Sequence, residues 1–424
     1  MFIVSMNQIL DFNHCRAERL YRQGLESERE GDQSEALALF EQAVELDSSH
    51  SDARVALAFH YRRLGRLDEA IAQCQAALEI GPHPVAYFNL GHALIDKNEH
   101  EAALEALRRC LELQPTFARA QYEIAFVYYL KSEYDVAITE FHRAAQIEPD
   151  WETYFFLGEC YRFTRRSSEA ERMYRKAMPL AGSWGQVEIT KAQLESVARQ
   201  REFPADADLS VKDRYYCDSG VVYLGTAQDS GLEIHPYFFY HFSYDDLAVT
   251  LKRFLAVIEA LNLRFSAVAP VDIVSHPLAM ALARRLGVGT EPRPNGNTLL
   301  VQALGETVEG LQDALERTPG ATTFCLAASW EEDWAPDILG IHTPLPSSVP
   351  WYRVGSFARL RSEAQGEAAG PLDRGEAESS FIDPRPAELI ATEILQALDR
   401  TQDEPTLPAQ VNYYRVAHRR LRFL

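Results

Sequence analysis

The chain has 424 residues, of which 46% are apolar and 25% are charged, the composition of a water-soluble protein with more than one domain. Its formal net charge of −20 argues against a nucleic-acid or anionic membrane partner, because phosphate binding needs clustered Lys and Arg. The six cysteines form no Cys-x-x-Cys pair, so no zinc site is predicted and a reducing, cytoplasmic compartment is expected.

Residues 1–16 are interpreted as an N-terminal segment. They lack the basic and apolar stretches of a secretory signal. No later stretch is long and apolar enough to be expected to span a membrane.

A repeat of about 34 residues dominates the chain from Ala17 to Met178. One of its columns holds small residues, namely Ala36, Ala70, Ala103, Ala137 and Ala170. A second holds mostly bulky ones, namely Phe40, Cys74, Leu107, Phe141 and Tyr174. Small residues let two antiparallel helices approach closely, and bulky ones fill the seam between neighbours. The period therefore predicts stacked helical hairpins.

These columns resemble the tetratricopeptide repeat. The second repeat shows Leu57, Ala58, Tyr61, Gly65, Ala70, Ala77 and Pro82, and the third shows Tyr87, Leu90, Gly91, Ala103 and Pro115. The resemblance implies an α-solenoid of five repeats over residues 17–182. Residues 183–203 are predicted to supply a capping helix and a linker, because a solenoid must cover its last hairpin.

The resemblance also implies that the first helix of each hairpin lines a concave groove. The candidate partner-binding residues there are mostly aromatic: Tyr21, Phe59, Arg62, Phe88, His92, Arg119, Tyr122, Phe126, Tyr129, Phe155 and Arg162. The class of such repeats that clamps a terminal carboxylate uses Lys, Asn and Arg, whereas here only Asn89, Arg119 and Arg162 could play that part and no Lys is present, so a carboxylate clamp is not predicted. An aromatic groove suits an apolar partner segment, and the alternative is that the chain's own C-terminal half covers it.

After Pro204 the repeat stops, and apolar runs alternate with helical stretches. Strands are expected at 220–225, 236–242, 265–269, 298–303, 322–327 and 338–342. Helices are expected at 244–261, 277–286 and 308–317, the first of them capped by Ser243. This alternation predicts an α/β domain with a mainly parallel sheet over residues 204–360.

Two stretches, residues 265–289 and 298–328, resemble a type I phosphoribosyltransferase domain. That family carries two adjacent acids where this chain has Gln302 and Ala303, and Glu306 in the following loop would repel a phosphate. The resemblance therefore implies a degenerate domain without transferase activity. Its vestigial pocket would comprise Asp272, His276, Gln302, Glu306 and Thr307, and no catalytic residue, cofactor or metal is predicted.

Residues 361–380 are rich in Gly, Ala, Glu and Ser, which predicts a flexible acidic loop. Residues 381–424 are expected to form C-terminal helices, and the last of them, with four arginines, could dock on the acidic body or in the groove.

The sequence thus favours a cytoplasmic scaffold or adaptor that binds a protein or peptide partner. It contains no complete catalytic motif. Two alternatives stay open at this point. One is an enzyme whose nucleotide- or sugar-phosphate-binding α/β domain is served by the repeats. The other is a structural subunit whose halves clamp each other.

Overall fold

The computed structural model describes residues 6–204, 206–225, 240–292, 297–305, 309–328, 336–342, 347–353, 381–402, 407–417 and 421. The chain divides into two compact units, Met1–Leu194 and Glu195–Leu424. Each unit is described by itself.

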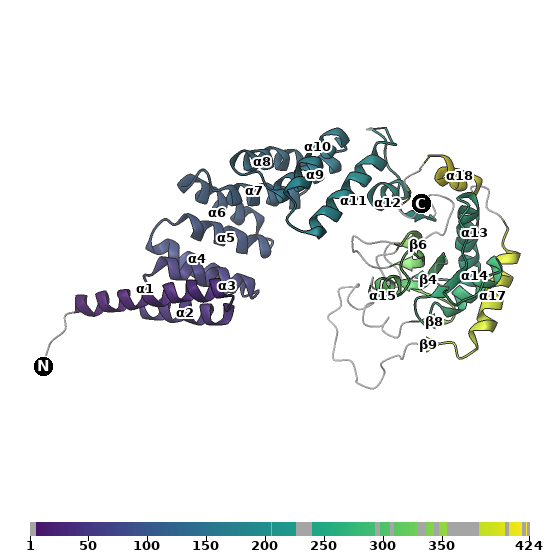
Figure 1. Cartoon of the computed structure of the whole chain (residues 1–424), viewed down its shortest axis with the longest axis horizontal. Coiled ribbons are helices and arrows are strands. Elements are labelled where there is room, and N and C mark those ends of the chain that lie inside the picture. The colour runs from purple at the N-terminus through teal and green to yellow at the C-terminus, as the bar shows by residue number, and fades with distance from the viewer. Residues whose placement is uncertain are drawn as a thin grey trace, which may run out of the picture. The chain divides into compact units, whose positions relative to one another are not determined.

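The first unit is a stack of helical hairpins (Figure 1). Each hairpin pairs an odd-numbered helix with the even-numbered helix that follows it. The helices are α1 Met6–Glu30, α2 Gln33–Leu46, α3 Ser51–Arg63, α4 Leu67–Ile80, α5 Pro84–Asp96, α6 His100–Leu113, α7 Ala118–Leu130, α8 Tyr134–Ile147, α9 Trp151–Phe163 and α10 Ser167–Ala177. The 34-residue period is therefore one hairpin per repeat.

Glycine allows three of the hairpins to close tightly. A Cβ at Gly91 would lie 2.6 Å from the side chain of Leu107, and one at Gly158 would lie 2.5 Å from the ring of Tyr174. Real Cβ atoms do not approach other atoms this closely, so these columns need glycine because a bulky partner lies opposite. Gly24 and Phe40 repeat the arrangement in the first hairpin.

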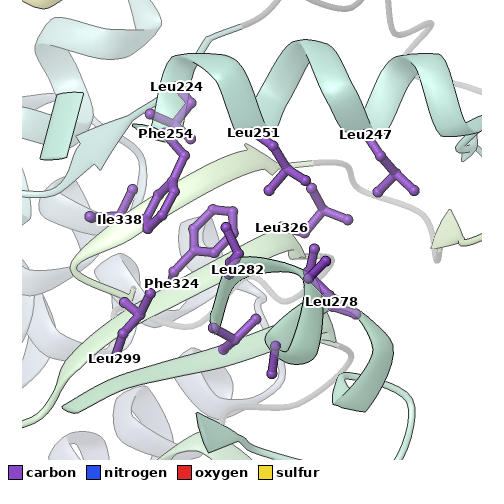
Figure 2. Close-up of a cluster of buried hydrophobic side chains, with 14 of the residues drawn as sticks. Leu224, Leu247, Leu251, Phe254, Leu278, Leu282, Leu299, Phe324, Leu326 and Ile338 are labelled. Atoms are coloured by element: carbon purple, nitrogen blue, oxygen red, sulfur yellow. The ribbon is translucent and has the colours of Figure 1, made fainter. Parts of the chain in front are cut away.

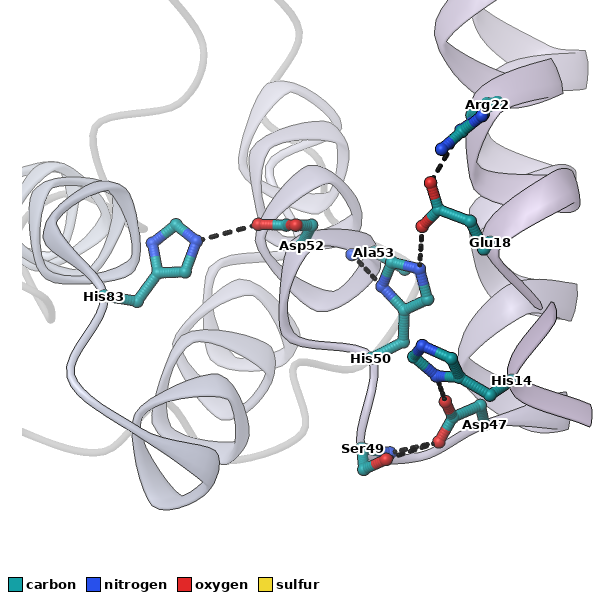
Figure 3. Close-up of polar contacts among 9 residues, drawn as sticks. All are labelled: His14, Glu18, Arg22, Asp47, Ser49, His50, Asp52, Ala53 and His83. Carbon is teal, nitrogen blue, oxygen red and sulfur yellow. Dashed lines mark hydrogen bonds and ion pairs between the residues drawn. The ribbon is translucent and has the colours of Figure 1, made fainter. Parts of the chain in front are cut away.

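Histidine side chains cap two of the odd-numbered helices. The Nδ1 atoms of His50 and His83 accept from the backbone N–H groups of Ala53 and Ala86, each at 3.2 Å. Each imidazole is held at Nε2 by an acid on the preceding odd helix: Glu18 holds His50 at 3.1 Å, and Asp52 holds His83 at 2.9 Å. Figure 3 shows the network, in which His14 also contacts Asp47. Consecutive hairpins are thereby joined through their helix caps.

The odd-numbered helices contact one another along the stack. Helix α3 contacts α5, α5 contacts α7, and α7 contacts α9, in addition to the contacts within each hairpin. The helix predicted over 183–200 is α11, Trp184–Gln200. Its fully buried Thr190 accepts from the Trp151 indole N–H at 3.0 Å, so α11 packs against the first turn of α9.

The second unit contains a five-stranded parallel sheet in the order β1-β6-β5-β4-β3. Its strands are β1 Val222–Tyr223, β3 Ala267–Pro270, β4 Thr298–Gly305, β5 Thr322–Ala328 and β6 Ile338–His342. The short pairs β2 Tyr240–His241 with β7 Ser347–Ser348, and β8 Tyr352–Arg353 with β9 Phe381–Ile382, lie outside it. The helices are α12 Val211–Ser219, α13 Tyr244–Ala260, α14 His276–Leu286, α15 Glu309–Arg317, α17 Ala387–Arg400, α18 Leu407–Asn412 and the π-helix η3 Tyr413–Ala417.

Helices cover both faces of this sheet. Figure 2 shows the larger core, where Leu251 and Phe254 of α13 and Leu282 of α14 meet Leu299 and Phe324 of the strands. Helix α17 joins the same core. Leu300 and Ala269 point to the other face and pack against α15, since alternate strand residues face opposite sides.

The predicted strands and helices of the second unit are present where the structure describes them, except that residues 381–382, which were predicted to be helical, form strand β9. Helix α13 begins at a capping box in which Ser243 and Asp246 bind each other's backbone N–H groups. Helix α12 was missed because its nine residues show no apolar periodicity. Most of the predicted strand at 236–242 and all of the loop at 361–380 lie outside the described residues.

Candidate functional site

The aromatic groove predicted from the sequence is only partly exposed. Phe59 exposes 38% of its surface, whereas Tyr122 and Phe155 expose 6% each and Arg162 exposes 8%. The prediction that these last three side chains form surface is therefore wrong, because they face the seams between helices. Tyr21 likewise lies against the rings of Phe40 and His50, with centroids 5.8 and 5.1 Å away.

The remaining candidates share one surface, which we call the odd-helix face. It comprises Phe59, Arg62, Phe88, His92, Arg119, Phe126 and Tyr129, all on α3, α5 or α7. Phe126 and Tyr129 meet the ring of Phe156 on α9, with centroids 5.2 and 5.1 Å apart. Phe88 stacks on Phe117 at 5.1 Å. Aromatic contact thus continues from one repeat to the next.

Polar side chains form a second line along the same face. Arg62 of α3 donates to Asp96 of α5 at 2.9 Å. Arg119 of α7 donates to Glu152 of α9 at 2.5 Å and lies 3.4 Å from Glu123 of its own helix. The partners Arg62 and Asp96 are 34 residues apart, and Arg119 and Glu152 are 33 apart. Opposite charges at the repeat period therefore tie α3 to α5 and α7 to α9.

Glu123 is the most perturbed carboxyl of this line. It exposes 3% of its surface, and burial raises its pKa from 4.5 to about 7, although Arg119 acts in the opposite direction. Burial also lowers the pKa of the neighbouring His92 to about 4. The His92 Nε2 atom lies 3.9 Å from Glu123 Oε1. At pH 7 His92 is neutral, so this contact is not an ion pair.

A buried polar group ends the line at α9. Arg162 donates to Glu159 at 2.9 Å, and the hydroxyl of Tyr174 on α10 donates to the same carboxylate. Burial raises the pKa of Tyr174 well above its usual range. Arg162 is therefore engaged inside the last hairpin rather than presented to a partner.

The vestigial-pocket residues of the second unit hold their own loop together. The Asp272 carboxylate accepts from the N–H and the hydroxyl of Ser275, each at 2.7 Å. The Ser275 Oγ in turn accepts from the N–H of Ala303 on β4 at 2.9 Å. This chain ties the end of β3 to the neighbouring strand. It gives Asp272 a structural role whether or not a ligand binds nearby.

Two other pocket candidates have specific positions. His276 is the first residue of α14, next to the buried Ser275. Gln302 on β4 is 4% exposed, and its Oε1 has no hydrogen-bond partner among the described residues. Glu306 and Thr307 lie outside the described residues. Within the described ranges, no group of three His, Cys, Asp or Glu side chains could hold a metal ion.

The described helices include none with both the length and the apolar character that crossing a bilayer would need. Three acids beside the odd-helix face, Asp96, Glu123 and Glu152, were not predicted from the sequence. A search for opposite charges one repeat apart would have found the first and third of them.

Known protein families match the repeat region. Two family models, both described as tetratricopeptide repeat, match residues 29–92 and 84–117. The N-terminal region of this chain carries tetratricopeptide repeats. The hairpin stack and the small and bulky columns agree with this match.

Several curated proteins are similar to the TPR region. A TPR repeat-containing protein of Methanocaldococcus jannaschii is 28% identical over 34% of this chain and 26% of its own length. A peroxisomal targeting signal receptor of Candida glabrata is 33% identical over 19% of this chain and 14% of its own. Anaphase-promoting complex subunit 3 of Schizosaccharomyces pombe is 24% identical over 41% and 26%. The chain thus spans about a quarter or less of each relative.

Solved structures are also similar to part of this chain. A thermophilic TPR protein of Thermus thermophilus is 24% identical, with a TM-score of 0.37, over 42% of this chain and 98% of its own. YrrB, described as a TPR protein with an unusual peptide-binding site, is 21% identical, with a TM-score of 0.34, over 41% and 90%.

Proposed function

We propose that this protein is a scaffold or adaptor that binds a segment of a partner protein on the odd-helix face. The observation that carries the proposal is the face itself. Partly exposed rings such as Phe59 share this face with the Arg62–Asp96 and Arg119–Glu152 pairs, which lie on four successive odd-numbered helices. A surface that offers both apolar area and oriented charges suits a peptide with mixed side chains.

The partner segment proposed here differs from the purely apolar one expected from sequence. Arg119 also places its guanidinium 4.9 Å from the Tyr122 ring centroid, so its position is fixed from two sides. Paired arginines and acids beside partly exposed rings favour a segment that carries charged residues among apolar ones.

A matched pair of variants tests the proposal. Phe59→Ala combined with Arg119→Glu removes one exposed ring and reverses one charge of the odd-helix face. Leu113→Ala removes an apolar side chain of similar exposure, 45%, from the even-numbered helix α6. Partners captured by the wild-type chain would be identified and their affinities measured by calorimetry. We expect the double variant, and not Leu113→Ala, to weaken binding at least about tenfold. Equal binding by all three proteins would refute the proposal.

For the second unit we propose a binding or regulatory role without catalysis. Gln302 and Ala303 stand where the phosphoribosyltransferase resemblance implies acids, and Asp272 is engaged by Ser275. The family-model matches lie in the N-terminal repeat region, so the phosphoribosyltransferase resemblance of the second unit stays a prediction. Thermal-shift measurements with phosphoribosyl pyrophosphate and nucleotides test it. A large stabilisation by phosphoribosyl pyrophosphate would favour the enzyme alternative.

A further inference from the structure

A column of tyrosines fills the seams between neighbouring hairpins. Each phenol hydroxyl meets a side chain of the preceding even-numbered helix: Tyr61 with Glu41 at 3.0 Å, Tyr128 with Arg108 at 2.9 Å and Tyr161 with His142 at 2.9 Å. Each ring also has a cation near its face, namely Arg66 at 4.1 Å, Lys131 at 6.0 Å and Arg166 at 4.6 Å from the centroid. The same three-part arrangement thus recurs in three seams.

The column is interrupted between the second and third hairpins. The position 33 residues after Tyr61 and 34 before Tyr128 holds Leu94, and the position of the hydroxyl partner holds Gln75. A pocket of about 450 Å³ lies in this seam, between α4, α5 and α6. Its lining includes Ile71, Gln75, Tyr87, Leu90, Leu94 and Ala106. The pocket is therefore located where the other seams hold a tyrosine ring.

The cation of the missing arrangement is nevertheless in place. Lys97 binds Asp68 at 2.9 Å and Glu99 at 3.1 Å. One repeat later, Lys131 binds Glu101 at 3.3 Å and Glu133 at 3.0 Å, while it faces the Tyr128 ring. Lys97, like Gln75, lines the pocket. All parts of the tyrosine site are thus present at Leu94 except the aromatic ring.

We propose that this pocket receives a tyrosine side chain from a partner protein. The ring would lie on Ile71, Leu90 and Leu94 and beneath Lys97, and Gln75 would hydrogen-bond to its hydroxyl. Gln75 can serve as donor or acceptor, which matches a phenol. The site therefore reproduces, between two molecules, the contact that Tyr128 makes within the chain.

The charges around the pocket indicate what flanks the tyrosine. Three carboxylates and two cations line it, and both cations are already paired: Lys97 with Asp68 and Glu99, and Arg109 with Glu112 at 2.8 Å. Glu105, also in the lining, has no ion-pair partner among the described residues. The occupant of complementary charge is a tyrosine next to a lysine or arginine.

This site is separate from the odd-helix face. Tyr87, Leu90 and Leu94 occupy one face of α5, whereas Phe88 and His92 occupy the opposite one, because the helix turns about 100° per residue. Binding of a tyrosine in this pocket and binding of a partner on the odd-helix face are therefore independent, and either can be absent without the other.

The test uses the full chain and three short capped peptides, Lys-Tyr-Lys, Glu-Tyr-Glu and Lys-Ala-Lys. We expect saturable binding of Lys-Tyr-Lys by NMR titration or calorimetry, with weaker binding of Glu-Tyr-Glu and none of Lys-Ala-Lys. Leu94→Tyr should fill the pocket with the chain's own ring, preserve the fold, and weaken Lys-Tyr-Lys binding at least about tenfold. Absence of saturable binding up to about 10 mM would overturn the inference, since small ligands in preformed pockets reach this range.

A gain-of-binding variant provides a second measurement. Tyr128→Leu removes the ring from the next seam and leaves Arg108 and Lys131 in place, so it should create a second Lys-Tyr-Lys site. If Leu94→Tyr binds Lys-Tyr-Lys as tightly as the wild type does, the peptide binds elsewhere and the assignment is refuted. A wild-type dimer that Leu94→Tyr converts to a monomer would assign the pocket to a second copy and also overturn it.

Discussion

The hydroxyl of Tyr414 binds both backbone groups of Tyr223, accepting from its N–H at 2.9 Å and donating to its carbonyl at 2.8 Å. Strand β1 is at the edge of the five-stranded sheet. The N–H groups of Val222 and Leu224, on either side of Tyr223, donate inward to the carbonyls of Asp337 and Leu339. Tyr223 therefore points its backbone groups outward, where a second chain could pair with them. One side chain from the C-terminal π-helix occupies that edge.

Removing this hydroxyl should destabilise the second unit and expose the strand edge. Tyr414→Phe keeps the ring but loses both hydrogen bonds, so we expect a loss of about 1–3 kcal/mol in the free energy of unfolding. Self-association should rise at high concentration. Urea unfolding and sedimentation velocity measure the two effects. Tyr215→Phe is the control, because the Tyr215 hydroxyl has no hydrogen-bond partner among the described residues. An equal effect of both variants would contradict this account.

The buried Glu123 should make the repeat region less stable as pH rises. Its pKa is about 7 in the folded chain, above the ordinary value of 4.5, so the folded state binds the proton more tightly than the unfolded state does. This contribution is fully present below pH 4.5 and is lost as pH rises through 7, by up to about 3 kcal/mol. Glu123→Gln should remove the dependence, as urea unfolding at several pH values would show. Identical pH profiles for the two proteins would argue against the assignment.

His92 should act in the opposite sense and in a lower range. Burial lowers its pKa to about 4, so the folded state binds this proton less tightly than the unfolded state. Its contribution is present above pH 6.5 and is lost as pH falls through 4. His92→Gln should therefore reduce the loss of unfolding free energy at acidic pH. The change near neutral pH, which comes from Glu123, should stay the same. A double variant separates the two contributions.

The histidine caps should respond to substitution by residue type. His83→Ala removes the acceptor for Ala86 N–H and should cost about 1 kcal/mol, whereas His83→Asn supplies another good capping acceptor and should cost less. Thermal unfolding of the wild type and the two variants at pH 7 tests this. If the Ala and Asn variants are equally destabilised, the capping role is wrong.

Reactivity of the cysteines should follow burial. Cys15 is exposed, whereas Cys74, Cys110, Cys160, Cys217 and Cys325 are buried. Burial raises the pKa of Cys74 to about 12 and that of Cys110 to about 11, which suppresses their thiolates. A disulfide reagent should therefore label one thiol rapidly in the folded chain and six after unfolding. Cys15→Ser should abolish the rapid phase.

The repeat columns predicted the hairpins because periodic small and bulky residues can pack in few other ways. The repeat pattern also led to a wrong prediction of which aromatic side chains are exposed. Tyr122 and Phe155 occupy positions that the repeat pattern places in a groove, yet each ring turns into a seam against a neighbour, Phe141 for Tyr122 and Tyr174 for Phe155. Both neighbours lie on the second helix of the same hairpin, so the position of a ring on the first helix does not by itself show whether the ring is exposed.

The acids next to the odd-helix face were missed for a different reason. Glu123 is the single acid of α7, and its neighbours include Arg119 of its own helix and His92 of the preceding repeat. Similarly, the role of Tyr414 depends on a strand 191 residues away in sequence. Local patterns locate helices and strands, whereas these contacts require the assembled fold.

The gap in the tyrosine column has a mechanical consequence. Because each hairpin contacts only its neighbours, the stability of the stack is close to a sum over its seams, and the weakest seam decides where it opens. The seam at Leu94 lacks the ring and the hydroxyl contact that the other three possess. Amide protons of α4 and α5 should therefore exchange before those of α7 to α9. Under strain, the solenoid would come apart there into two blocks.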